Sequence, residues 1–148
     1  MRFKLAGAIV AGLLLTGLSA APAAATTNTI TTGSPVTLTD RVLVTVPLTV
    51  VCDPLPGPSF DTLVDVTVTQ ASGTAVATGS RGLEVDPAPL FTCDGVTQNH
   101  IVLKVLPDSG SPPFHGGGAI VQADFSIFSS TCGCSESGNT TAPVKIRG

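Results

Sequence analysis

The sequence predicts an all-β protein, an antiparallel immunoglobulin-like β-sandwich of about seven to nine strands. Apolar and polar residues alternate with period two over several stretches, as in strands with one buried and one solvated face. Val and Thr are abundant, and the chain has sixteen Gly, twelve Pro, no Trp and no Tyr. This composition is typical of short strands joined by tight turns. No helix signal follows the first 25 residues, and a small β-barrel is the alternative architecture.

Residues 1–25 are expected to form a cleaved signal peptide. Basic residues close to Met1 precede an uncharged apolar stretch from Leu5 to Leu18. Pro22 and Ala23-Ala24-Ala25 then supply the helix break and the small side chains that precede a signal-peptidase cut, so Thr26 becomes the first mature residue. The alternative is an uncleaved membrane anchor, since such a segment is close to the ~20 residues that cross a bilayer.

The strands of the predicted domain, residues 26–130, follow in order. Weak signals occur at 29–32 and 36–38. The strongest strand begins at residue 41, and Pro47 inside it predicts an edge position or a bulge, because proline cannot donate to a neighbouring strand. Its expected inward row is Val42, Val44, Val46, Leu48 and Val50.

Three further regions alternate in the same way. The stretch 63–70 is followed by a turn at 71–74, by a strand at 75–80 and by a short one at 82–85. In the stretches 99–106 and 119–128, valine, isoleucine, leucine and phenylalanine occupy the inward positions. Residues 131–148 are expected to form a polar Cys-x-Cys tail with at most a last short strand at 144–146.

Charge limits the classes of partner. After residue 25 the chain carries five basic and ten acidic residues, a net charge of −5. This balance argues against nucleic acid and anionic membranes as partners. No second apolar stretch of membrane length follows, so no membrane association is expected after signal cleavage.

Four cysteines in an exported chain predict two disulfides, for which three pairings are possible. We expect Cys52 to pair with Cys93, because Cys52 ends the strongest strand on its inward parity and Cys93 lies just before another strand. Cys132 and Cys134 would then close a small ring around Gly133. This pair is interpreted as a staple for the tail. A redox-active or metal-binding pair is the alternative, disfavoured because redox cysteines usually stand beside basic groups or a helix N-terminus.

No catalytic site, metal site or cofactor is predicted. His100 and His115 do not have the spacing of a compact zinc motif with the late cysteines, so both are expected to be solvated. No Ser-His-Asp set is placed together by the sequence. Four aspartates are interpreted as solvated turn residues, with a calcium site at one end of the sandwich as the alternative: Asp53, Asp61, Asp65 and Asp94.

The candidate ligand residues lie in or beside two long loops rich in Pro and Gly, 53–59 and 107–118. Loops at the ends of a rigid scaffold are where function is most often found. Three phenylalanines and one histidine form the candidate surface: Phe60, Phe91, Phe114 and His115.

Several residues together resemble small secreted bacterial β-sandwich domains of unknown function that share a Cys…Cys-Asp-Gly pattern. The resemblance covers about residues 42–125 and leaves Cys132 and Cys134 outside. It implies a shared disulfide between Cys52 and Cys93 and nothing about activity. Its motifs are Cys52 at a strand end, Val68-Thr69-Gln70-Ala71, Cys93-Asp94-Gly95, His100, and Phe114 before Gly118-Ala119.

The function expected from these observations is that of a secreted, non-catalytic extracellular module that binds a protein or a glycan or has a structural role. A small-molecule carrier or an enzyme inhibitor, using the phenylalanine surface, is the second hypothesis. A hydrolase with His100 or His115 as the base ranks last.

Overall fold

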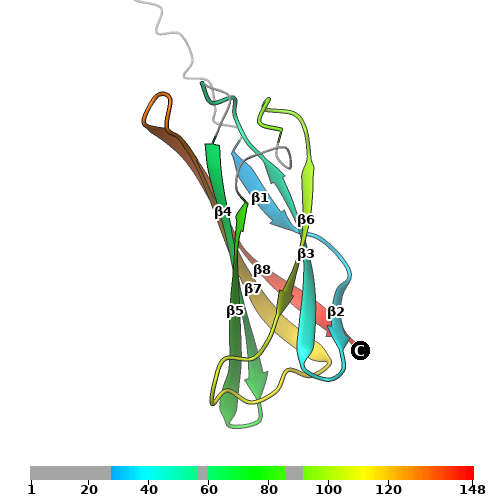
Figure 1. The fold of residues 1–148 in the computed structure, drawn as a ribbon. Coiled ribbons are helices and arrows are strands. Elements are labelled where there is room, and N and C mark those ends of the chain that lie inside the picture. Colours follow the sequence, from blue (N-terminus) through cyan, green and yellow to red (C-terminus); the bar gives the residue numbers. More distant parts are fainter. Residues whose placement is uncertain (1–27, 57–59, 86–91) are drawn as a thin grey trace, which may run out of the picture.

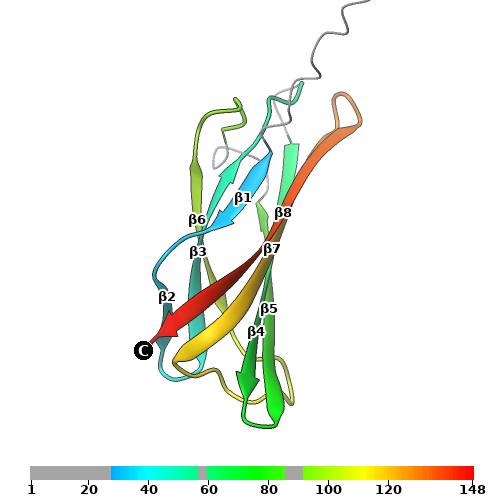
Figure 2. The ribbon, with the colours of Figure 1, turned by 180° about the vertical axis from the view of Figure 1, so that it is seen from behind.

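The structure is a computed structural model that describes residues 28–56, 60–85 and 92–148. The predicted signal peptide and Phe91 lie outside the described residues. Within these ranges the chain is all-β, as predicted, and contains eight strands (Figure 1; Figure 2). The described residues hold no helix that could cross a membrane. The strands are β1 (Thr29–Thr32), β2 (Val36–Thr39), β3 (Leu43–Val51), β4 (Phe60–Ser72), β5 (Ala75–Val85), β6 (Asn99–Val105), β7 (Gly117–Ser129) and β8 (Cys134–Arg147).

The strands form one mixed sheet with the order β1-β3-β2-β8-β7-β4-β5, and β6 pairs with β3. All pairings are antiparallel except that of β2 with β8, which is parallel through Val36 and Ile146 and through Thr37 and Arg147. The prediction of a wholly antiparallel arrangement is therefore wrong. β2 pairs with β3 on one side and with β8 on the other, and it runs in the same direction as β8.

Pro47 does not mark an edge strand. β3 has β6 on one side and, on the other, β1 and β2 in succession. The Pro47 carbonyl accepts a hydrogen bond of 2.8 Å from the Gly33 backbone N–H, in the connection between β1 and β2. In a strand the N–H and C=O of one residue point to the same side of the strand. The nitrogen of Pro47, which carries no hydrogen, therefore faces the gap between the β1–β3 pairing and the β2–β3 pairing. A proline is tolerated there because no neighbouring strand needs its N–H.

β4 and β5 form a long hairpin with the turn where the sequence predicts it. Ser72 pairs with Ala75 across Gly73 and Thr74, and Gly73 has a φ of 61°, which glycine adopts without strain. The two strands expected at 75–80 and 82–85 are one continuous strand. Gly82 is part of the ladder opposite Asp65, where a Cβ would lie 2.6 Å from the Asp65 Oδ1.

β8 replaces the polar tail expected for residues 131–148. It is a strand of 14 residues that pairs with β7 along almost its whole length, from Cys134 opposite Ser129 to Ile146 opposite Gly117. Six of its 14 residues are Ser, Thr, Asn or Gly, and they all lie in its first eight positions, so apolar alternation could not reveal this part of the strand. Its strand conformation follows from pairing with β7, whose own apolar row is strong.

Among the described residues, the buried apolar side chains form one hydrophobic core. It confirms the inward rows expected for β3, β4 and β7, except that Val42 precedes β3 and is exposed. Figure 1 shows two ends of the molecule. The disulfide end carries the C-terminus of β3 and the β7–β8 turn, and the loop end carries the β4–β5 turn and residues 106–116. The core side chains from these three strands are Val44, Val46, Leu48, Val50, Val64, Val66, Val68, Ala119, Val121, Ala123, Phe125 and Ile127.

Candidate interaction surfaces

Phe114, the part of the predicted phenylalanine surface whose burial the structure describes, does not contribute to an exposed surface. Phe114 is only 2% exposed and belongs to the hydrophobic core, so it is not available to a ligand. Phe60 begins β4 opposite Ser129, at the disulfide end, whereas Phe114 lies at the loop end. Phe91 lies outside the described residues. The loop position of Phe114 suggested exposure, but the loop folds inward and uses this ring to cover the core.

His115 is exposed and belongs to a hydrogen-bonded clamp at the loop end. Its backbone N–H donates to the Gln70 Oε1 at 2.9 Å, and the Gln70 Nε2 donates to the His115 carbonyl at 2.8 Å. The ring nitrogens lie 3.0 Å from the Gly116 carbonyl and 3.1 Å from the Ala71 carbonyl. Gln70 is buried, and its amide is satisfied by this loop. The arrangement holds the loop in place against β4.

The two histidines lie at opposite ends of the molecule. His100 is exposed near the start of β6, with its Nδ1 3.1 Å from the Thr49 Oγ1. It is thus near the disulfide end, while His115 is at the loop end. Within the described ranges no group of three or more His, Cys, Asp or Glu side chains is placed to hold a metal ion.

Cys52 is paired with Cys93, and Cys132 with Cys134. The first disulfide is buried at Cys52 and ties the end of β3 to the segment before β6. Asn99 closes the same region: its Nδ2 donates to the Thr92 carbonyl at 3.0 Å, and its Oδ1 accepts from the Thr92 N–H at 2.7 Å. Disulfides are compatible with an extracellular location.

Asp94, between Cys93 and β6, caps its own turn. Its carboxylate accepts the Thr97 backbone N–H at 2.6 Å, the Thr97 hydroxyl at 2.7 Å and the Val96 backbone N–H at 2.8 Å. These donors, the Thr97 backbone first, hold the pKa of Asp94 below its ordinary value of 3.8. The carboxylate of Asp94 is thus hydrogen-bonded within its own turn, and this structural role explains the aspartate at this position.

Thr97→Val is expected to raise the pKa of Asp94, because it removes the hydroxyl donor and keeps the backbone donors and the side-chain shape. Since the folded pKa is depressed, the contribution of Asp94 to stability is present above 3.8 and is lost as the pH falls through the folded pKa. A carboxyl NMR titration of both proteins measures the change. Equal pKa values would show that the hydroxyl does not act on the carboxylate.

The outward side chains of β4, β5, β7 and β8 form a surface that we call the outer face. Four large apolar side chains are exposed on it: Leu63 (41%), Phe128 (44%), Ile120 (50%) and Val76 (55%). Sequence reasoning missed them. The signal was present in β7, where Ile120 and Phe128 interrupt a row that is otherwise polar.

Two shallow grooves lie at the ends of the outer face. The disulfide-end groove has a volume of about 250 Å³, and Leu63 and Phe128 supply its apolar walls beside Asp61, Thr62 and Ser126. The loop-end groove has a volume of about 360 Å³. It is lined by Thr69, Ala71, Val76, Gly118, Ala119 and Ile120.

An acidic pair lies between the two grooves. Asp65 of β4 is directly opposite Asp124 of β7, and their flanking partners in the same row are Gly82 of β5 and Asn139 of β8. Like charges directly opposite each other in a sheet are destabilising. This row contains no basic residue, so no side chain directly across the strands neutralises the negative charge of the two carboxylates.

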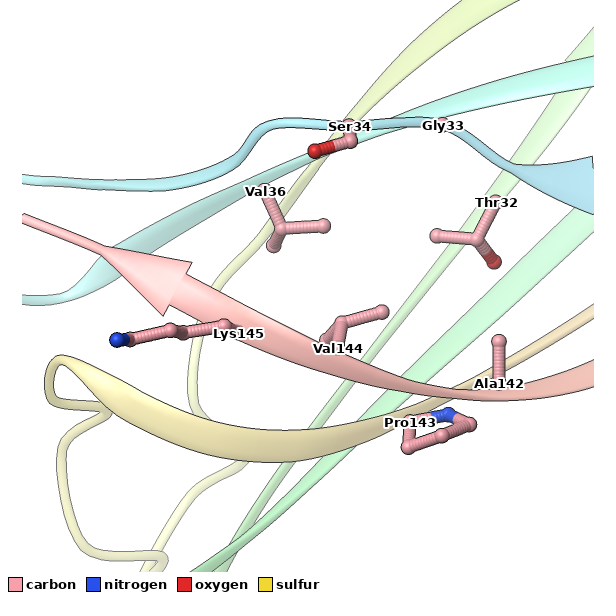
Figure 3. Close-up of a pocket in the computed structure, with 8 residues that line it drawn as sticks. All are labelled: Thr32, Gly33, Ser34, Val36, Ala142, Pro143, Val144 and Lys145. Atoms are coloured by element: carbon pink, nitrogen blue, oxygen red, sulfur yellow. The ribbon is translucent and has the colours of Figure 1, made fainter.

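A third groove, of about 230 Å³, separates the β1–β2 connection from β8 (Figure 3). It opens because β2 pairs with β8 only at its first residues, while the chain before Val36 leads away to β1 and β3. In Figure 3 the side chains of Val36 and Val144 fill part of this fork, and Pro143 points away from it. The Thr32 Oγ1 lies buried there without a hydrogen-bond partner. The groove is a small opening between diverging strands.

Fold and surfaces together define an all-β protein with two disulfides and an outer face that carries exposed apolar side chains. No protein-family model, curated protein sequence or solved structure matches the chain.

Proposed function

We propose that the protein is a secreted, non-catalytic extracellular module of immunoglobulin-like architecture that binds a protein partner through its outer face. The observation that carries the proposal is the group of exposed apolar side chains, Leu63, Phe128, Ile120 and Val76, around the Asp65–Asp124 pair. Exposed apolar side chains next to polar groups are typical of protein-binding surfaces, and here two apolar grooves flank an acidic centre.

Strand order supports a sandwich architecture. β1, β3 and β6 are neighbours, and β8, β7, β4 and β5 are neighbours, with β2 touching both sets. In both ribbon views β3 and β6 lie to one side of β4, β5 and β7 (Figure 1; Figure 2). Two antiparallel sets around one core are the defining feature of such sandwiches.

Secretion is supported by two independent features. The first 25 residues have the order of a signal peptide, basic then apolar then small. All four cysteines are paired as disulfides, which form and persist in oxidising compartments.

A protein partner is favoured over a glycan and over a small molecule. Glycan sites commonly stack sugars on Trp or Tyr, and the chain has neither. Ligand carriers enclose most of their ligand in a pocket of about 300–1,000 Å³. Here the largest of the described grooves on the outer face, about 360 Å³, is shallow, and Phe114 is in the core.

Site-specific photocrosslinking tests the proposal. A photoreactive phenylalanine at position 128, on the outer face, is expected to form a discrete adduct with a protein of the producing organism's culture medium or cell surface. The double substitution Leu63→Asp and Ile120→Asp should abolish the adduct, because charges are costly to bury in an apolar interface. The matched control places the same probe at Val102, which is exposed on β6 outside this face. No adduct, or the same adduct from both positions, would contradict the proposal.

A further inference from the structure

The two disulfides lie in different environments. Cys52 is fully buried and its bond spans a sequence separation of 41. Cys132 and Cys134 are separated by 2 and lie in and beside the turn between β7 and β8, with Cys132 exposed. Figure 1 shows this turn at the tip of a hairpin that projects beyond β4. A thiol of another molecule can therefore reach the exposed Cys132, whereas Cys52 is inaccessible and Cys93 is half-buried.

The hairpin already holds the turn without the second disulfide. The β7–β8 ladder continues to Ser129 opposite Cys134, and the Gly133 N–H donates to the Ser129 carbonyl at 2.9 Å. Gly133 adopts a φ of 65° in this turn. Because these backbone contacts do not depend on the S–S bond, the two cysteines are expected to stay neighbours when the bond is open. The disulfide therefore adds little to the restraint that the backbone hydrogen bonds already place on this turn.

The surroundings of Cys132 also suit the reduced state. Its sulfur lies 3.9 Å from the Ser129 carbonyl and 4.0 Å from the Pro56 carbonyl. A disulfide sulfur has no hydrogen to donate, whereas a thiol has one. Reduction therefore gives Cys132 a donor with acceptors within reach.

We propose that Cys132–Cys134 is a thiol–disulfide exchange site that oxidises the dithiols of extracellular proteins. A partner thiolate attacks the exposed Cys132 sulfur, the S–S bond breaks, and its electron pair passes to Cys134, which takes up a proton. The second partner thiolate attacks the mixed disulfide and releases Cys132. The partner loses two electrons and two protons and becomes a disulfide, while Cys132 and Cys134 become thiols.

Low-molecular-weight disulfides of the medium return the pair to the oxidised state by the same steps in reverse. The absence of a basic residue in the Ser130-Thr131-Cys132-Gly133-Cys134 segment is consistent with this direction. In the oxidation of the partner the attacking thiolate belongs to the partner, so this step does not need a cation beside Cys132 or Cys134. In the return step one of these two cysteines is the attacking thiolate, and without a neighbouring cation this step is expected to be the slower one. This redox activity belongs to the β7–β8 turn and goes beyond the proposed function, in which the module is non-catalytic and acts by binding at the outer face.

The test is a redox titration of the mature protein in mixtures of reduced and oxidised dithiothreitol, followed by alkylation and peptide mass spectrometry. We expect Cys132–Cys134 to open in less reducing mixtures than Cys52–Cys93, while the protein stays folded. We also expect the oxidised protein to convert a synthetic two-cysteine peptide to its disulfide, one peptide per protein. The variant Cys132→Ser/Cys134→Ser keeps Cys52–Cys93 and should lose this conversion.

Two results would overturn the proposal. One is that Cys132–Cys134 opens only together with Cys52–Cys93 or with loss of the fold, which is the behaviour of a structural staple. The other is that the Cys132→Ser/Cys134→Ser variant oxidises the peptide as fast as the parent protein. Both readouts are independent of the photocrosslinking at position 128, so this inference and the proposed function fail separately.

Discussion

Replacing Phe114 by alanine is expected to lower the free energy of unfolding by about 3–5 kcal/mol. The ring is 2% exposed and packs in the core, and its Cζ lies 3.0 Å from the place that a Cβ on Gly79 would occupy. Gly79 thus has no side chain that could fill the space left by the ring. A Cβ there would also lie 2.2 Å from the Leu106 carbonyl oxygen, so β5 and the loop are in close backbone contact.

The same loop is hydrogen-bonded to the backbone of β5, and these bonds limit how far the loop can move to close the cavity left by the ring. The Asp108 N–H donates to the Thr78 carbonyl at 2.8 Å, and the Ser111 Oγ accepts the Thr78 N–H at 2.7 Å. Incomplete closure is what makes a large-to-small substitution costly. Urea unfolding of the mature protein measures the loss.

Phe128→Ala is the matched control, because it removes the same ring from an exposed position on the outer face. A change below about 1 kcal/mol is expected there. The opposite pattern, a stable Phe114→Ala protein that has lost a bound ligand, would restore the ligand role that the sequence predicts for Phe114.

The sequence predicts which side chains face the core wherever the alternation is strong. In β3, β4 and β7 each strand carries a run of valine or other apolar residues on one parity, and these rows are buried. A register shift by one residue would expose the entire apolar row, so the alternation of apolar and polar residues is enough to predict which face of the strand is buried. The pairing of Cys52 with Cys93 was predictable for the same reason, since Cys52 extends the inward row of β3.

Strand neighbours and strand direction were not predictable in the same way. The alternation within β2 and β8 does not say that they pair, or that they run parallel. β8 itself has a polar sequence and is ordered by its ladder with β7, a long-range contact that local composition does not contain. Pro47 is tolerated in an interior strand only because β1 and β2 leave a break beside it, which is again a property of the assembled sheet.

Whether a side chain is exposed was predicted less well by its position in a loop than by its odd or even position along a strand. Phe114 and His115 are adjacent in one loop, yet the first is in the core and the second is exposed. Ile120 and Phe128 lie within a strand and were overlooked, although both occupy the solvent parity of β7. An apolar residue at a solvent position of a strong strand is thus the more informative signal for a binding surface.

Loss of the Cys52–Cys93 disulfide is the other substitution expected to have a large effect. Its sequence separation is 41, and for a loop of this size the chain-entropy model gives about 4 kcal/mol. The double variant Cys52→Ala/Cys93→Ala should lose about this amount, because the bond restrains the long segment that contains β4 and β5 in the unfolded chain. Asn99 and its bonds to Thr92 remain, so the native geometry near β6 has a second support.

Cys132→Ala/Cys134→Ala is the control, since it removes a disulfide whose sequence separation is only 2. The same model gives less than about 2 kcal/mol for so small a loop. Urea unfolding of both variants under non-reducing conditions compares the two losses. Equal losses would mean that loop length does not control the stabilisation, and that the bond at the β7–β8 turn holds native structure that its hairpin hydrogen bonds do not hold alone.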